Sequence, residues 1–330
     1  LYSTITHMRS ERLVRLIGST DQPLVDTYHD KIRETILAGM SEDQRKQRHL
    51  QLAETIEANE GLVADDLLAS LSASSTPGEY DREISPRVFD LAHHFCQTND
   101  DRAFVYQFSA AEQSLKAYAT EDALELYVRA ERLLPDNASP TLRYRLWIAM
   151  GRVFLWNQMV GPANKSYTRA VNCAESSFDR ARAYAGLGHV HRQVAEFDQA
   201  IEAYDEALQH LNVRRPRSTI GKLSSFATAS LRVLAIPVTW QRSRIEQDSK
   251  QALLKHEILV AIGPPLLDKD CLACLDTLIY GALAAFQVGE NRLLSVAHAR
   301  ASEVFSGMGL HWLGNLCLRR SERVESLEED

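Results

Sequence analysis

The sequence is poor in cysteine and has no long uninterrupted apolar run. Its 330 residues include five cysteines, an odd number scattered along the chain. This usage argues against a disulfide framework and favours a reducing compartment, the cytoplasm. The most apolar stretches, 231–240 and 272–288, are interrupted by charged residues or proline and are shorter than the roughly 18 apolar residues that span a membrane. We therefore expect a cytoplasmic protein with no stable membrane span.

The short motifs that carry catalytic chemistry are also missing. There is no Gly-x-x-x-x-Gly-Lys-Ser/Thr or Gly-x-Gly-x-x-Gly loop, no His-Arg-Asp string, no Gly-x-Ser-x-Gly elbow and no His-Glu-x-x-His pair. Phosphate binding, phosphoryl transfer, ester hydrolysis and metalloprotease chemistry therefore have no residue support. The sequence predicts no catalytic residue, no enzyme activity and no cofactor for this chain.

The charge balance is mildly acidic. Lys and Arg number 37 against 44 Asp and Glu, which gives a net charge of -7. A surface with this balance repels a phosphate backbone, so nucleic acid is not expected as a partner. Hydrophobic residues at 45% and charged residues at 25% are usual for a folded globular chain.

One spacing recurs in the middle of the chain: an alanine, a tyrosine four positions later and an alanine three positions after that. Steps of three and four residues return to the same side of a helix, so each set places two alanines and a ring on one face. Alanine lets a neighbouring helix approach closely, and the ring fills the groove between two helical hairpins. The three sets are Ala123, Tyr127 and Ala130; Ala163, Tyr167 and Ala170; and Ala200, Tyr204 and Ala207.

A partner helix precedes the second and third sets. Both partner helices carry an aromatic residue, an apolar residue next to a glycine, and then another ring. This arrangement resembles the tetratricopeptide repeat, in which helix A has this pattern and helix B has the alanine–aromatic–alanine pattern. The resemblance implies a solenoid of hairpins whose concave face binds a protein or peptide ligand. The signature positions are Trp147, Gly151, Ala163, Tyr167, Ala170, Leu187, Gly188, Ala200, Tyr204 and Ala207.

The repeat pattern stops near Asn212, where the run 214–217, Arg-Arg-Pro-Arg, breaks the helix. Beyond it we expect a packed insertion with two helices of another type, over 223–236 and 245–262. The alternative is a segment that lies on a membrane surface or contacts a partner. From residue 272 the hairpin pattern returns weakly.

The first part of the chain predicts helices around a short extended segment. Residues 1–17 read as an amphipathic helix, and 24–28 as extended. Asp30 is expected to be the N-cap of a helix that ends near Met40, and Ser41 to mark the start of the next helix.

Three strings, at 28–34, 90–95 and 123–134, resemble bacterial signal-transduction ATPases of the STAND type, which are often fused to a serine/threonine kinase. The resemblance runs through most of the chain. It implies the end of a winged-helix domain and, upstream of Leu1, a separate AAA-type domain that binds ATP or ADP with magnesium. In that family the histidine of a His-Asp pair contacts the nucleotide, so the resemblance assigns this role to His29. The alternative is that His29 packs against the wing.

The sequence thus predicts an all-α fold, a tetratricopeptide-like solenoid of helical hairpins preceded by a partial winged-helix remnant. The expected segments are the end of a winged-helix domain at 1–58, a linker at 59–85, repeats at 86–212, the insertion at 213–270, and further hairpins with an acidic tail at 271–330. Because Leu1 is preceded by no initiating Met and no signal peptide, we expect a fragment.

The predicted function is that of a sensor and coupling module of a multidomain signalling ATPase, with the upstream ATPase or kinase domains and a protein ligand as its partners. A free-standing tetratricopeptide adaptor and a part of an ATPase-type transcription regulator are the alternatives. Ligand contacts are expected on the inner face of helix A. The candidate residues there are Arg152, Asn157, Arg192 and Gln193.

Metal binding is not predicted. Cys271 and Cys274 lack a second pair at zinc spacing, so core packing is favoured for them. His93 and His94 are adjacent and are expected to point to different faces of a helix, and His191 occupies an aromatic position of the repeat.

Overall fold

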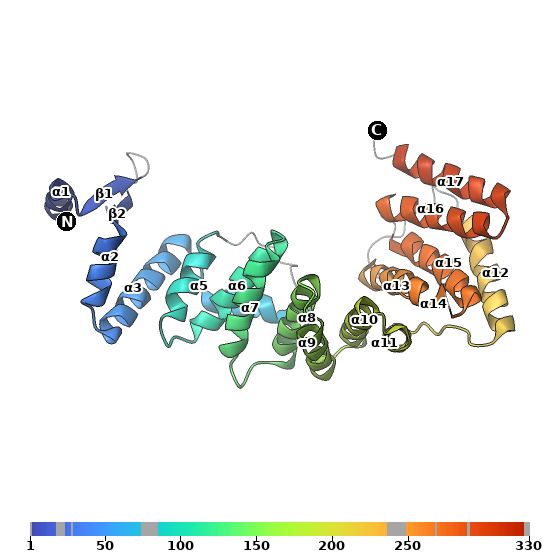
Figure 1. The fold of residues 1–330 in the computed structure, drawn as a ribbon, viewed down its shortest axis with the longest axis horizontal. Helices are drawn as coiled ribbons and strands as arrows, with labels where there is room; N and C mark the ends of the chain where they lie inside the picture. Colours follow the sequence, from blue (N-terminus) through green and yellow to red (C-terminus); the bar gives the residue numbers. More distant parts are fainter. Residues whose placement is uncertain are drawn as a thin grey trace. The chain divides into compact units, whose positions relative to one another are not determined.

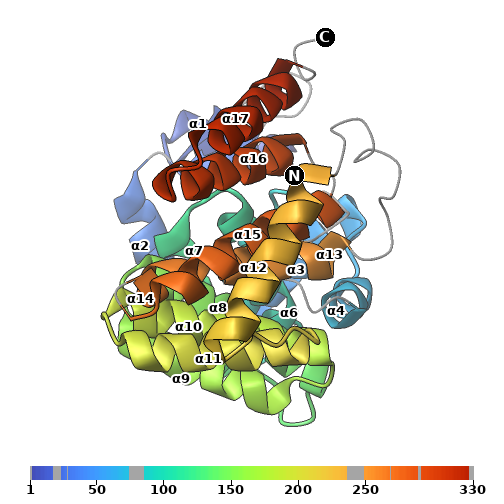
Figure 2. The same ribbon diagram turned by 90° about the vertical axis from the view of Figure 1, so that its right-hand side faces the viewer.

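The computed structural model of the chain contains seventeen α-helices and one two-stranded sheet in its described residues (Figures 1 and 2). It therefore confirms the predicted all-α class. The chain divides into two compact units, unit 1 with residues 1–67 and 82–110 and unit 2 with residues 68–81 and 111–330. The structure describes residues 2–17, 24–27, 29–73, 85–235, 249–267, 269–288 and 291–326.

Unit 1 begins with a helix and an antiparallel strand pair. The helix expected over 1–17 ends at Ser10, because Val14 to Ile17 instead pair with Leu24 to Thr27, with Val14 opposite Thr27. The extended stretch predicted at 24–28 is confirmed for 24–27, and Tyr28 lies outside the described residues. The elements are α1 (Tyr2–Ser10), β1 (Val14–Ile17), β2 (Leu24–Thr27), α2 (Asp30–Ala38), α3 (Glu42–Glu60), α4 (Ala64–Ala73), α5 (Val88–Cys96) and α6 (Arg102–Lys116), with the boundary between the units falling within α4 and within α6.

Two helix starts in unit 1 show how local sequence sets boundaries. The N-cap of α2 is His29, and Asp30, predicted as the cap, is the first helical residue. At that position its carboxylate still favours the helix, because the first turn carries the positive end of the helix dipole. The N-cap of α3 is Ser41, as predicted, and Gln44 completes a capping box with it.

The segment predicted as a linker, 59–85, is not all linker. It contains α4, in which Leu71 is fully buried. A leucine buried to this extent belongs to a packed helix, so the prediction was wrong for residues 64–73. Residues 74–84 lie outside the described part of the chain.

Unit 2 is a succession of helical hairpins. Neighbouring helices run side by side in the pairs α8 with α9, α10 with α11, and α16 with α17 (Figures 1 and 2). Its helices are α7 (Thr120–Arg132), α8 (Pro140–Trp156), α9 (Val160–Cys173), α10 (Ser177–Gln193), α11 (Phe197–His210), α12 (Thr219–Ala235), α13 (Ser249–Ala261), α14 (Gly263–Leu267), α15 (Cys271–Val288), α16 (Asn291–Gly307) and α17 (His311–Ser326).

The repeat signature predicted ring–glycine contacts between helices of the repeat region. The rings of Tyr167 and Tyr204 are buried, and each lies against a glycine of helix A. A Cβ atom on Gly188 would come within 2.5 Å of the Tyr204 ring, closer than carbon atoms can approach. The glycine is therefore required by the close approach of the ring. Leu187, the other expected contact of this helix, is only half-buried.

The turns between paired helices repeat one backbone conformation. Tyr118, Gln158 and Ala195 stand at φ 59°, 59° and 60°. This left-handed conformation costs a residue with a side chain roughly 1–2 kcal/mol, so packing of the flanking helices must offset it. The absence of glycine at these turns explains why the turn type could not be read from the sequence.

The predicted insertion is built into the helical stack. Its two expected helices are present as α12 and α13, and both pack on α15. Ile258 of α13 and Cys274 of α15 share a buried cluster with Tyr204 of the third repeat. The core position expected for Cys274 is confirmed, whereas Cys271 is exposed.

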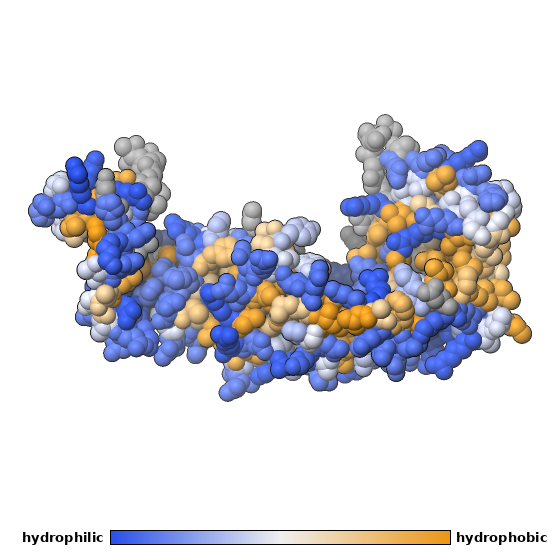
Figure 3. All heavy atoms as spheres, in the orientation of Figure 1, coloured by the Kyte–Doolittle hydropathy of each residue, from blue (hydrophilic) through white to orange (hydrophobic). Residues whose placement is uncertain are grey.

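Helix α15 is long and apolar enough to cross a membrane, and it is the one such helix in the described residues. Most of that helix is buried against other helices of the unit, mainly α12, α13 and α16. A core helix has the same composition, so a stable membrane span is not indicated. Apolar side chains also lie on the outer surface of α12, where Ile220, Leu223 and Leu231 are exposed (Figure 3).

Candidate functional site

A groove of about 870 Å³ in unit 2 is bordered mainly by side chains of α8, α10 and α13. Three of the four residues predicted to bind a ligand, Arg152, Arg192 and Gln193, line it. A second hollow of about 350 Å³ continues it and shares Arg152 and Tyr167. We call the two together the inner groove. The structure thus brings together side chains that are 40 residues apart in the sequence.

Asn157, the fourth predicted residue, does not line the inner groove. It follows the last residue of α8, and its side-chain amide donates a hydrogen bond to the carbonyl of Val153 at 2.9 Å. Its role is therefore local, because it satisfies a carbonyl at the helix end.

One wall of the inner groove was not foreseen. Lys250, Leu253 and Glu257 of α13 face the repeat helices across it. Their steps of three and four residues place them on one face of α13. Nothing in the repeat pattern marks this helix. It lies about 60 residues beyond α10 in the chain, because α10 ends at Gln193 and the three lining residues begin at Lys250.

The inner groove is richer in positive than in negative charge. Among the described residues, four cationic side chains and the carboxylate of Glu257 line it. Burial raises the pKa of that carboxyl, although the charges of Arg182 and Arg152 act in the opposite direction. The cationic residues are Arg152, Arg182, Arg192 and Lys250.

Apolar surface lies beside these charges. Trp156 is 47% exposed, and the guanidinium of Arg152 lies 5.3 Å from the centre of its ring. Leu253 and Val260 of α13 line the same groove. The Trp156 ring, with the Arg152 guanidinium near its face and aliphatic side chains beside it, forms a surface on which an extended peptide can pack.

The lining of the inner groove includes a half-buried histidine, His189. The His189 Nδ1 atom shares a 2.9 Å hydrogen bond with the hydroxyl of Tyr204. Burial, with a smaller effect from the charge of Arg192, lowers the pKa of His189 to about 4. The ring is therefore neutral at physiological pH and fixes the Tyr204 hydroxyl without adding charge.

We expect unit 2 to lose stability as the pH falls below about 6.5. Burial lowers the pKa of His189 and of His298 to about 4 from 6.5. The unfolded chain therefore binds protons at these positions between the two values, while the folded chain does not, and folding becomes less favourable toward acid. Thermal unfolding at about pH 7 and about pH 5 measures the change. The difference should shrink in the variant with both His189→Gln and His298→Gln, and an unchanged difference would refute the assignment.

Two cations of the segment after α11 form ion pairs inside the unit. Arg215 pairs with Asp205 through two hydrogen bonds of 2.6 and 2.7 Å, and Lys222 pairs with Asp270. These pairs border a hollow of about 670 Å³. They support the predicted packed insertion rather than a segment reserved for a membrane surface.

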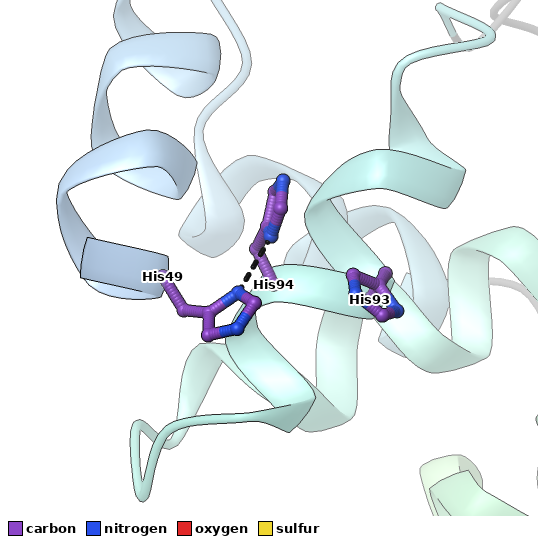
Figure 4. A group of neighbouring side chains, drawn as sticks. All are labelled: His49, His93 and His94. Carbon is purple, nitrogen blue, oxygen red and sulfur yellow. Dashed lines mark hydrogen bonds between the residues drawn. The ribbon is translucent and has the colours of Figure 1, made fainter. Parts of the chain in front are cut away.

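Three histidines of unit 1 lie together, contrary to the sequence argument. The rings of His93 and His94 are 5.2 Å apart between centroids, although the two residues are adjacent in α5. His49 of α3 completes the group, with its Nδ1 atom 2.9 Å from Nδ1 of His94 (Figure 4). Burial lowers the pKa of both His49 and His94. Long side chains from neighbouring helix positions can converge when a second helix lies beside them, which the sequence does not show.

His29 is exposed at the start of α2, and its side chain makes no capping hydrogen bond. The structure therefore places it where a ligand outside this chain could reach it.

The comparisons with known proteins assign no family. No protein-family model matches the chain, and no curated protein matches it. Among solved structures, the crystal structure of MamA has a TM-score of 0.41 and 13% sequence identity to this chain, and the match covers 66% of this chain and 96% of MamA. A likeness at this level adds nothing to the fold described above.

Proposed function

We propose that unit 2 binds a peptide segment of another protein in the inner groove and that the segment carries acidic and apolar residues. The observation that supports this most directly is the lining of the groove, where the described residues include four cations and one carboxylate beside exposed apolar surface. A peptide of this composition satisfies both kinds of lining. A basic peptide would meet repulsion from the same cations.

The groove also has the dimensions of a ligand site. Its main part, of about 870 Å³, lies within the range of roughly 300–1,000 Å³ that is usual for ligand sites. The walls come from helices that pack on one another, so the site is largely formed before the ligand arrives. Binding then requires ordering of the peptide but little rearrangement of the protein.

We predict that an acidic peptide binds more tightly than its neutral counterpart by at least about ten-fold. Three fluorescein-labelled peptides test this, identical in length and leucine positions, with Glu, Gln or Lys at the remaining positions. Fluorescence anisotropy measures each affinity, and the affinity for the Glu peptide should fall as the salt concentration rises. Equal affinities for the three peptides, or no binding of the Glu peptide, would refute the proposal.

Charge reversal in the groove should weaken binding of the Glu peptide by about ten-fold or more. Arg192→Glu is the first choice because Arg192 is exposed at the groove. Arg319→Glu is the matched control, since it makes the same change in net charge at an exposed position of α17. If both variants weaken binding equally, the effect belongs to the net charge and not to the groove.

We further propose that the chain couples ligand binding to an upstream ATPase. The motivation is the resemblance of the 28–34 and 90–95 strings to signal-transduction ATPases, together with the exposed position of His29. ATP or ADP with magnesium would be bound by that upstream domain, and a cytoplasmic location would follow. Calorimetry with ADP on a chain that includes an ATPase domain ahead of Leu1 tests this, with His29→Ala expected to weaken binding. If ADP binding is absent or unaffected by His29→Ala, the plain adaptor is the better description.

A further inference from the structure

We propose that His49, His93 and His94 form a binding site for a divalent transition-metal ion, with zinc as the expected ion. One ring nitrogen from each histidine lies within 4.8 Å of the other two. All three residues belong to unit 1. The site is separate from the inner groove and does not depend on the function proposed for it.

Helix packing brings the three rings together. Leu91 and Phe95 of α5 are fully buried, and α5 packs along α3. His94 is half-buried at the edge of that packed face and His93 is exposed next to it. His49 projects from α3 toward both, with ring centroids 5.8 Å from His93 and 5.1 Å from His94 (Figure 4). The group is therefore held by two packed helices and remains open to solvent on one side.

The present geometry is near that of a bound ion. Zinc–nitrogen bonds of about 2.0–2.1 Å in a tetrahedron require ligand nitrogens about 3.3 Å apart. The Nδ1 atoms of His49 and His94 are 2.9 Å apart, and the most distant of the three ligand atoms are within 4.8 Å. Small rotations of the side chains are enough to bring the three nitrogens to this spacing.

The chemistry of the donors selects the kind of ion. Three imidazole nitrogens suit zinc, copper and nickel, whereas magnesium and calcium prefer oxygen ligands. Three protein ligands also leave a fourth position, which water or a group from outside can take. Asp90, one turn before His94 on α5, acts on His94 with a negative charge, and its carboxylate also pairs with Arg87 at 2.7 Å.

A bound ion would connect α3 to α5. Both helices carry ligands, so the ion would oppose their separation and stabilise unit 1. The expected role is a clip between the helices, with one coordination position accessible.

Zinc binding is tested by calorimetry with zinc sulfate on the full chain, made without a histidine tag and freed of metal by chelation. We expect one zinc per chain and a rise in the thermal unfolding midpoint when zinc is added. His49→Ala and His93→Ala should each reduce the affinity by at least about ten-fold, and cobalt(II) should show the visible spectrum of four-coordinate rather than hydrated cobalt.

The control is His311→Ala, an exposed histidine at the start of α17. It should bind zinc as the unaltered chain does. Circular dichroism of each variant without zinc shows whether it is folded, and His93→Ala, at an exposed position, preserves the test if His49→Ala does not fold. The proposal is overturned if zinc does not bind, or if His311→Ala lowers the affinity as much as the cluster variants.

Discussion

Arg145→Met is expected to destabilise unit 2 by about 3–5 kcal/mol, because it removes one partner of a buried ion pair. Arg145 and Glu112 are 1% and 0% exposed at their side chains, and their charged atoms are 3.4 Å apart. The guanidinium also donates hydrogen bonds to the carbonyls of Ser70 and Leu71. Without it, the Glu112 carboxylate remains buried and loses this cation, while the Tyr127 hydroxyl still donates a hydrogen bond to it. Arg152 is a further positive charge acting on Tyr127.

Urea unfolding followed by tryptophan fluorescence measures this change, since the four tryptophans of the chain all lie beyond residue 146, in unit 2. The double variant with Arg145→Met and Glu112→Leu is the control, because removal of both charges removes the unpaired one. It should be more stable than Arg145→Met alone. If the double variant is instead less stable by the sum of the two single losses, the ion pair is not the source of the effect.

Gly188→Ala is expected to cost about 1–3 kcal/mol by overpacking. Alanine is the better helix former by about 1 kcal/mol, so propensity alone predicts the opposite sign. The added methyl group would lie 2.5 Å from the buried ring of Tyr204, and Gly186→Ala would place one 2.3 Å from Tyr167. The sign of the measured change therefore separates packing from propensity.

Gly307→Ala is the matched control for the glycine variants. A Cβ atom at Gly307, the last residue of α16, meets no other atom within 4 Å. It should be neutral or stabilising in the same urea experiment. A stabilising effect at both Gly188 and Gly307 would show that the tyrosine rings can move aside, and the tight fit of the repeat would then be wrong.

The repeat helices could be predicted because their contacts are local in the sequence. The Gly188–Tyr204 contact joins two helices of one hairpin, and the spacing of small and aromatic residues records it directly. The same reasoning missed Gly186, although its contact with Tyr167 is closer. That contact joins α10 to the preceding hairpin, and the repeat signature has one glycine position in helix A where this chain uses two.

The sequence by itself determined the all-α class, the hairpins of the repeat region and three side chains of the inner groove, Arg152, Arg192 and Gln193. These features follow from the periodicity of the sequence. A helix returns a side chain to the same face every three or four residues, whichever helices it packs against. Only the tertiary structure decided that α13 forms the opposite wall of the groove and that His49 meets His93 and His94. Both depend on which helices pack together and in which register, and that choice comes from the summed burial of many side chains far apart in the sequence, which no local pattern contains.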